Sequence, residues 1–112
     1  MTYFSVEETQ CNCCGKNLMN EEFMSKLNAI RGHCNFPFIL TSAFRCAEHN
    51  KAINGAAKSS HLLGRAVDIK ATGKKALTII ENARAFGFSG VGISKSFVHI
   101  DDNHQHATIW TY

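Results

Sequence analysis

The stretch of sequence that decides the fold is Ser59–Asp68, which reads SSHLLGRAVD. His61 and Asp68 stand seven positions apart in this stretch, and Gly64 lies between them. Because glycine adopts backbone conformations that other residues avoid, Gly64 allows a sharp turn that brings His61 back beside Asp68. An imidazole and a carboxylate placed side by side are two of the groups that bind a divalent metal ion.

The end of this stretch and a second run of sequence predict two strands with the same pattern. In residues 65–70, Asp68 points to the face opposite its two β-branched neighbours. In Phe97–Asp101, His99 also lies between two β-branched residues. If these apolar side chains pack together in the core, Asp68 and His99 emerge on the same face of a sheet. The β-branched residues are Val67, Ile69, Val98 and Ile100.

We therefore expect His61, Asp68 and His99 to converge on one metal ion. Two imidazoles and one carboxylate are a common catalytic zinc set, and they leave a fourth position for water. Taken singly, a histidine is more often a hydrogen-bonded or surface residue than a ligand, and an aspartate on a strand often caps a loop. It is the joint placement on one face that favours metal binding.

Two amphipathic helices are predicted, at residues 20–31 and 74–86. Asn20 is a good N-cap for the first helix. Gly32 is expected to end this helix and Gly87 the second one. The residues expected to face the core are Phe23, Leu27 and Ile30 in the first helix and Leu77, Ile80 and Ala83 in the second.

The strands are expected to form a small antiparallel sheet with the helices packed on one side, which is an α+β fold. A length of 112 residues predicts one domain, residues 1–112, in which residues 1–18 are an irregular, cysteine-rich lead-in. Strands are predicted at residues 38–44, 65–70, 90–94 and 97–101, with residues 107–112 as a candidate for a last strand and a short helix at 47–53.

Composition excludes several classes of protein. The net charge is +3 with neutral histidines, which suits an anionic polymer as partner but is far too small to indicate nucleic-acid binding. There is no run of about 18 apolar residues, so we expect no membrane span. Residues 1–8 lack the basic start and apolar block of a secretory signal, so we expect synthesis in the cytosol.

The cysteines allow two interpretations. An odd number leaves at least one thiol unpaired, and a reducing compartment disfavours a disulfide framework. The run Cys11–Gly15 could hold a structural zinc ion, completed by Cys46 or His33. Its spacing does not match paired Cys-x-x-Cys motifs, so we favour reduced, partly buried thiols that pack as small apolar groups. The cysteines are Cys11, Cys13, Cys14, Cys34 and Cys46.

Three segments resemble one known family. Residues 59–68 match the signature Ser-x-His-x-x-Gly-x-Ala-x-Asp of the M15 zinc peptidases. Residues 42–45 (SAFR) are similar to that family's Ser-Gly-Tyr-Arg segment, and GVGI at 90–93 followed by FVHID at 97–101 resembles its closing metal-ligand segment. The family includes D-alanyl-D-alanine carboxypeptidases and phage endolysins that cut L-alanyl-D-glutamate bonds in peptidoglycan. The resemblance covers most of the chain, from about residue 4 to residue 101.

The resemblance implies a hedgehog/DD-peptidase-like fold and a zinc-dependent hydrolase of peptidoglycan stem peptides. His61, Asp68 and His99 would be the zinc ligands. Arg45 would bind a substrate carboxylate with its guanidinium fork, and Ser59 would hydrogen-bond substrate or brace its loop. We expect a monomer that acts on the cell wall after release.

One departure from the family concerns the general base. Many members carry an acid three positions before the last histidine ligand, where this chain has Ser96. Asp101 lies on the same strand face as His99, within about 7 Å, and could take that role. Alternatively, it could orient the imidazole of His99. Weaker candidates for the base are Asp102, Glu48, His104 and His106.

Two other functions stay open. A zinc-binding but non-catalytic module, as in the hedgehog signalling domain, would bind a partner without hydrolysis, and Ser96 is the residue that keeps this alternative open. A structural component of a phage particle is the second alternative. The sequence also leaves open whether the enzyme would be a carboxypeptidase or an endopeptidase.

Overall fold

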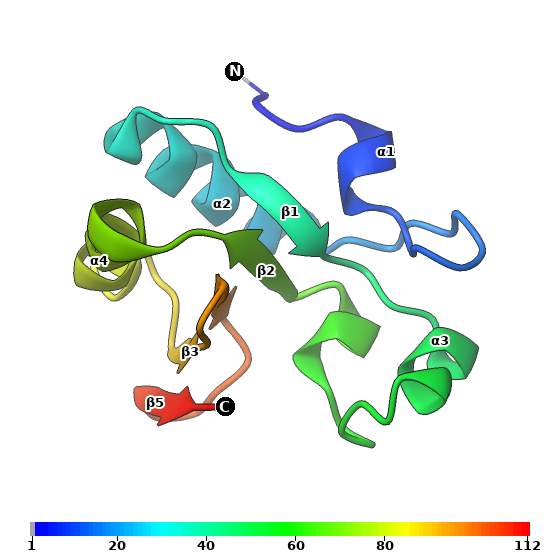
Figure 1. Ribbon diagram of the computed structural model, residues 1–112. Coiled ribbons are helices and arrows are strands. Elements are labelled where there is room, and N and C mark those ends of the chain that lie inside the picture. Colours follow the sequence, from blue (N-terminus) through cyan, green and yellow to red (C-terminus); the bar gives the residue numbers. More distant parts are fainter. Residues whose placement is uncertain (1) are drawn as a thin grey trace.

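Residues 2–112, which the computed structural model describes, form helices and one five-stranded sheet, and this confirms the expected α+β class (Figure 1). The helices are α1 (Val6–Thr9), α2 (Glu21–Cys34), α3 (Ala47–Ala52) and α4 (Gly73–Ala83), with a 3-10 turn η1 (Ser60–Leu63). The strands are β1 (Ile39–Ser42), β2 (Ala66–Lys70), β3 (Gly90–Ile93), β4 (Phe97–Asp101) and β5 (Thr108–Thr111). Among these residues, no helix has the length and apolar character needed to cross a membrane.

The sheet has the strand order β1-β2-β4-β3-β5. The first three pairings are antiparallel, as expected, but β5 runs parallel to β3, so the sheet is mixed. After β4 the chain reverses direction as in a hairpin. Because β2 and β3 already occupy both sides of β4, the last strand pairs with the far edge of β3 and runs parallel to it.

The register of β2 and β4 confirms the alternation predicted from sequence. Asp68 pairs with His99, and Ala66 pairs with Asp101. The intervening side chains point to the opposite face, where they form the core together with residues of α2 and α4. These core residues are at most 1% exposed: Val67, Ile69, Val98, Ile100, Phe23, Leu27, Ile30, Ile79 and Ala83.

In Figure 1, α2 and α4 lie mainly to the left of the strands, whereas α3 and the loop before β2 lie together at the right. The predicted core face of α2 is therefore confirmed, but that of α4 is partly wrong. Leu77 is 55% exposed, and Ile79 is buried in its place. Two positions along a helix correspond to a rotation of about 200°, so Leu77 and Ile79 lie on nearly opposite faces.

Of two chain turns predicted from the sequence, the structure places one differently and confirms the other. The first predicted helix continues past Gly32 and ends at Cys34, because its C-cap Asn35 takes the left-handed conformation with φ 58°. Gly64 confirms the expected sharp turn, with φ 68°. Its carbonyl oxygen accepts a hydrogen bond from the backbone of Asn20 (2.9 Å), and this contact ties the loop after η1 to the start of α2.

A candidate metal centre in a cleft

Three side chains from three different elements converge on one face of the sheet. His61 comes from η1, Asp68 from β2 and His99 from β4. One ligand atom from each lies within 4.8 Å of the others, close enough to share one metal ion. Asp68 Oδ1 lies 3.3 Å from His61 Nε2 and 2.9 Å from His99 Nδ1. Two imidazoles and one carboxylate fit zinc and leave one coordination position for water or substrate.

His61 is oriented by the segment that follows β1. Its Nδ1 donates a hydrogen bond to the carbonyl oxygen of Ala43 (2.7 Å). Since a carbonyl can only accept, Nδ1 carries a proton, and Nε2 is the ring nitrogen that faces Asp68. The backbone N–H of Arg45 donates to the His61 carbonyl oxygen (3.1 Å). The Oγ of Ser59 accepts from the His61 backbone N–H (3.2 Å), so Ser59 braces the turn that carries His61.

His99 is held from its other side by Asp101. Its Nε2 lies 2.7 Å from Asp101 Oδ2, while Nδ1 faces Asp68. Asp101 is fully buried, and its Oδ1 accepts from Asn103 N–H (3.1 Å) and contacts His104 Nδ1 (2.7 Å). Both oxygens of Asp101 are therefore engaged. A carboxylate on the far nitrogen of a ligand imidazole is a common feature of zinc sites, where it fixes the ring and raises its basicity.

The two carboxylates at this centre are ionised, and the proton on His99 competes with a metal ion. Burial would raise the pKa of Asp68, but hydrogen bonds with His61 and His99 hold it well below its usual range. Burial also opposes the charged form of His99, yet hydrogen bonds with Asp101 and Asp68 raise its pKa to about 8. Against burial again, hydrogen bonds with His99 and His104 lower the pKa of Asp101. The centre therefore holds two ionised carboxylates around a histidine that retains its proton.

The three side chains lie in a cleft of about 540 Å³ that Arg45 also lines. Arg45 is 8% exposed, and its Nη1 donates to Asn50 Oδ1 (2.9 Å) and its Nη2 to Ser42 Oγ (3.2 Å). Its Nε is buried and has no hydrogen-bond partner among the described residues. An unpartnered donor on a buried cation is unfavourable unless a ligand supplies the acceptor.

Glycines on β3 make room for side chains on this face. A Cβ atom at Gly90 would overlap the carboxylate of Asp101 and the ring of His104. A Cβ atom at Gly92 would lie 2.7 Å from Nε1 of Trp110 on β5. The ring of Trp110 packs against that of His99 at a tilt of 54°, with centroids 5.1 Å apart, and Trp110 lines the cleft.

The other candidates for a general base are placed differently. Asp102 is bound by Lys26 (3.1 Å) and Arg65 (2.8 Å), and its side chain is 1% exposed. Glu48, Ser96 and His106 are exposed, and the described lining of the cleft does not include them. His104 does line the cleft, and its side chain is 34% exposed.

Several residues of the cleft did not stand out in the sequence. Asn50, which holds Arg45, and Trp110 and Tyr112, which line the cleft, come from α3 and from the C-terminal strand. The pairing of β5 with β3 brings Trp110 beside Gly92, and this pairing is not visible in the spacing of residues.

The cysteines are arranged differently from what we favoured. Four of the five bring their Sγ atoms within 4.8 Å of one another: Cys11, Cys13, Cys14 and Cys46. Cys13 and Cys14 are exposed, so the expectation that they pack as small apolar groups is wrong. Cys34 lies in α2 outside this cluster, and His33 packs against Phe86 with ring centroids 5.1 Å apart.

The sequence was compared with models of known protein families and with curated proteins. The family model described as Peptidase M15 matches residues 2–101 of the chain. No curated protein matches the chain.

Proposed function

Because the chain belongs to the M15 peptidase family, we propose that it is a zinc-dependent peptidase that cleaves stem-peptide bonds of peptidoglycan, as phage endolysins do. Membership of this family supports metallopeptidase activity. The observation that carries the proposal is the convergence of His61, Asp68 and His99 in a cleft beside the buried Arg45. On this proposal the protein acts on the cell wall after release from the cell that makes it.

His61, Asp68 and His99 are the proposed zinc ligands, through Nε2, a carboxylate oxygen and Nδ1. When bound, zinc would lower the pKa of a coordinated water and polarise the scissile carbonyl. The chain supplies a fixed geometry for this. Ala43 holds the His61 ring by its Nδ1, and Asp101 holds the His99 ring by its Nε2. Both rings are therefore oriented so that Nε2 of His61 and Nδ1 of His99, once deprotonated, would present a lone pair to zinc.

Arg45 is proposed to bind a carboxylate of the substrate. Arg45 lines the cleft, and its Nε lacks an acceptor among residues 2–112. Stem peptides of peptidoglycan are rich in carboxylates, and the planar guanidinium fork binds a carboxylate through two parallel hydrogen bonds. Ser59 also lines the cleft, but its Oγ already accepts from His61 N–H, which supports bracing as its main role.

Two residues are candidates for the proton acceptor, Asp101 and His104. The engagement of both Asp101 oxygens supports a positioning role, in which it orients the rings of His99 and His104. His104 faces the ionised Asp101 with Nδ1, so Nδ1 carries a proton and Nε2 is free to accept another. We favour His104 as the general base in the cleft, held by Asp101.

The main alternative is a module that binds zinc without hydrolysis. Ser96, which stands where many relatives carry an acid, is exposed and outside the lining of the cleft. Digestion of purified peptidoglycan with the zinc-loaded protein, followed by mass spectrometry of the products, separates the two functions. New peptide termini identify an endopeptidase, and free D-alanine identifies a carboxypeptidase. If the stem peptides stay intact even when the protein is as concentrated as the wall substrate, the peptidase assignment is refuted.

A further inference from the structure

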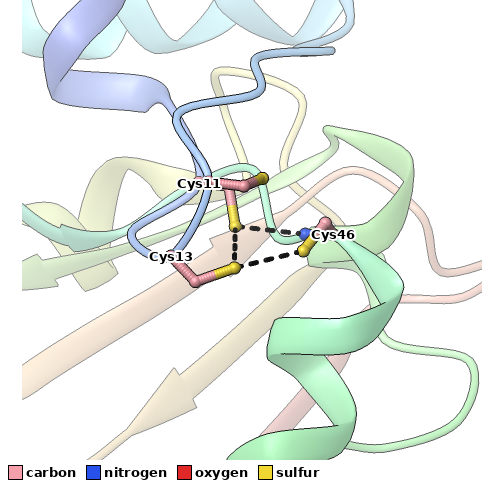
Figure 2. Close-up of side chains that lie close together, drawn as sticks. Cys11, Cys13 and Cys46 are labelled. Atoms are coloured by element: carbon pink, nitrogen blue, oxygen red, sulfur yellow. Dashed lines mark hydrogen bonds between the residues drawn. The ribbon is translucent and has the colours of Figure 1, made fainter.

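A second cluster of metal-ligating side chains lies outside the cleft, where the N-terminal segment meets the start of α3. Figure 2 shows Cys11, Cys13 and Cys46 with their sulfur atoms turned toward one another. The Sγ of Cys13 lies 3.6 Å from that of Cys11 and 3.4 Å from that of Cys46. Cys14 completes the group, and all four Sγ atoms lie within 4.8 Å of one another.

These separations suit a tetrahedral zinc site. A Zn–S bond of about 2.3 Å requires neighbouring sulfurs about 3.8 Å apart in a tetrahedron. A disulfide would require about 2 Å, and the five cysteines are free. The distances from Cys13 to Cys11 and Cys46 are thus close to those of a shared metal ion and far from those of a covalent pair.

The backbone around the cluster is shaped to present the sulfurs. The N–H of Cys11 donates to the carbonyl of Lys16 (2.7 Å), and the N–H of Gly15 donates to the carbonyl of Cys11 (3.0 Å). Gly15 has φ 73°, which allows the chain to close this tight turn. Two amides donate to sulfur: Cys46 N–H to Cys11 Sγ (3.4 Å) and His49 N–H to Cys46 Sγ (3.3 Å). Such hydrogen bonds stabilise thiolates.

We propose that Cys11, Cys13, Cys14 and Cys46 bind a second zinc ion in a closed structural site. Four thiolates fill the tetrahedral shell and leave no position for water, so the site has no hydrolytic role. On binding, the four thiols release their protons to solvent and no electron is transferred. Soft thiolate ligands select zinc over the hard cations magnesium and calcium. This site is independent of the function proposed for the cleft.

The position of the cluster indicates what the ion does for the fold. It joins the turn at residues 11–16 to Cys46, the residue directly after Arg45. The same segment carries the Ala43 carbonyl that orients His61. Apart from the sulfurs, the N-terminal segment is joined to this part of the chain by hydrogen bonds from Phe44 N–H to Thr9 O (3.1 Å) and from Asn12 Nδ2 to Thr41 O (3.3 Å). A zinc ion here would cross-link the N-terminal segment to the support of both His61 and Arg45.

Metal content of the full-length purified protein tests the proposal, with reductant present and with no assay of activity. We expect two zinc ions per chain in the wild type. His61→Ala, which removes a ligand of the cleft, should keep one. The double variant Cys13→Ser/Cys46→Ser should lose one, whereas the control Cys34→Ser, outside the cluster, should keep both. If His61→Ala retains no zinc, or if the double variant holds as much zinc as Cys34→Ser, the proposal is wrong.

Cobalt substitution in His61→Ala supplies a second readout that does not require the cysteine variants to fold. We expect a thiolate-to-cobalt charge-transfer band and intense tetrahedral ligand-field bands. Alkylation of folded His61→Ala loaded with zinc should label only Cys34. Removal of the zinc by a chelator should then expose the other four thiols. Absence of the charge-transfer band, or an intact mass that shows a disulfide after purification without oxidant, would overturn the proposal. Failure of wall digestion leaves these results unchanged, so the two proposals fail separately.

Discussion

The Nε2 atom of His99 lies 2.7 Å from Oδ2 of the fully buried Asp101. The opposite ring nitrogen, Nδ1, faces the proposed metal position. Asp101 therefore lies on the far side of the His99 imidazole from the proposed centre. Gly90 makes this arrangement possible, because a side chain there would displace the carboxylate.

We predict that Asp101→Asn weakens zinc binding and activity together. Loss of the carboxylate removes the group that fixes the ring of His99, and changes of this kind cost about 10- to 100-fold in metal affinity. Competition with a chromogenic chelator measures the affinity, and peptide release measures turnover. Unchanged zinc affinity with lost turnover would instead make Asp101 the general base.

His104→Gln is expected to lower kcat by about 100- to 10,000-fold, the range for loss of a general base. Zinc content and KM should change little, because His104 is not one of the three proposed zinc ligands. His106→Gln is the matched control, because His106 is exposed and outside the described lining of the cleft. Equal activity of the two variants would exclude His104 as the acceptor.

Arg45→Lys should raise KM for stem peptides, because lysine cannot reproduce the paired hydrogen bonds of a guanidinium. The surface variant Arg84→Lys serves as the control. A substrate series with the carboxylates amidated one at a time sharpens the test. Amidation of the recognised carboxylate should penalise the wild type and leave Arg45→Lys nearly unaffected. If every amidated substrate penalises both proteins equally, Arg45 does not bind a substrate carboxylate.

Zinc affinity at the cleft should fall as the pH is lowered. Hydrogen bonds with Asp101 and Asp68 overcome the effect of burial and raise the pKa of His99 to about 8. Below that pH the metal must displace a proton from His99, and above it the ring is already neutral. We expect the affinity to drop by up to about tenfold per pH unit below about pH 8 and to level off above it. The difference between titrations of the wild type and of His61→Ala, which removes a ligand of the cleft, isolates the cleft for this measurement.

Gly64→Ala should destabilise the fold strongly. Gly64 has φ 68°, and a Cβ atom there would lie 2.7 Å from Cα of Met19. Left-handed strain of about 1–2 kcal/mol adds to overpacking of about 1–3 kcal/mol. Gly73→Ala is a matched control, because Gly73 has φ 57° but an open space around it. Chemical denaturation should show the larger loss for Gly64→Ala, and equal losses would contradict the close approach to Met19.

The juxtaposition of Asp68 and His99 could be predicted because it depends on strand alternation alone. Two β-branched neighbours on each strand fix which face is buried, and the observed register pairs the two residues directly. The turn at Gly64 was predictable for a similar local reason. Leu77 was misplaced because several helical phases fit one apolar pattern, and packing against the sheet selects among them.

Other contacts depend on how distant segments meet. The contact of His104 with Asp101 requires the loop after β4 to fold back, and Trp110 reaches the cleft only because β5 pairs with β3. The cysteine cluster is the clearest case. Cys46 joins the N-terminal turn through tertiary structure, so the spacing within Cys11–Gly15 gave no complete ligand set.

Removal and restoration of zinc tests the central claim most directly. Wild-type protein stripped by a chelator should release no peptide products from purified peptidoglycan, and added zinc should restore release. His61→Ala should stay inactive at every zinc concentration while it retains the fold, as judged by circular dichroism. Product release by stripped wild type, or by His61→Ala at the wild-type rate, would contradict a zinc peptidase centred on His61, Asp68 and His99.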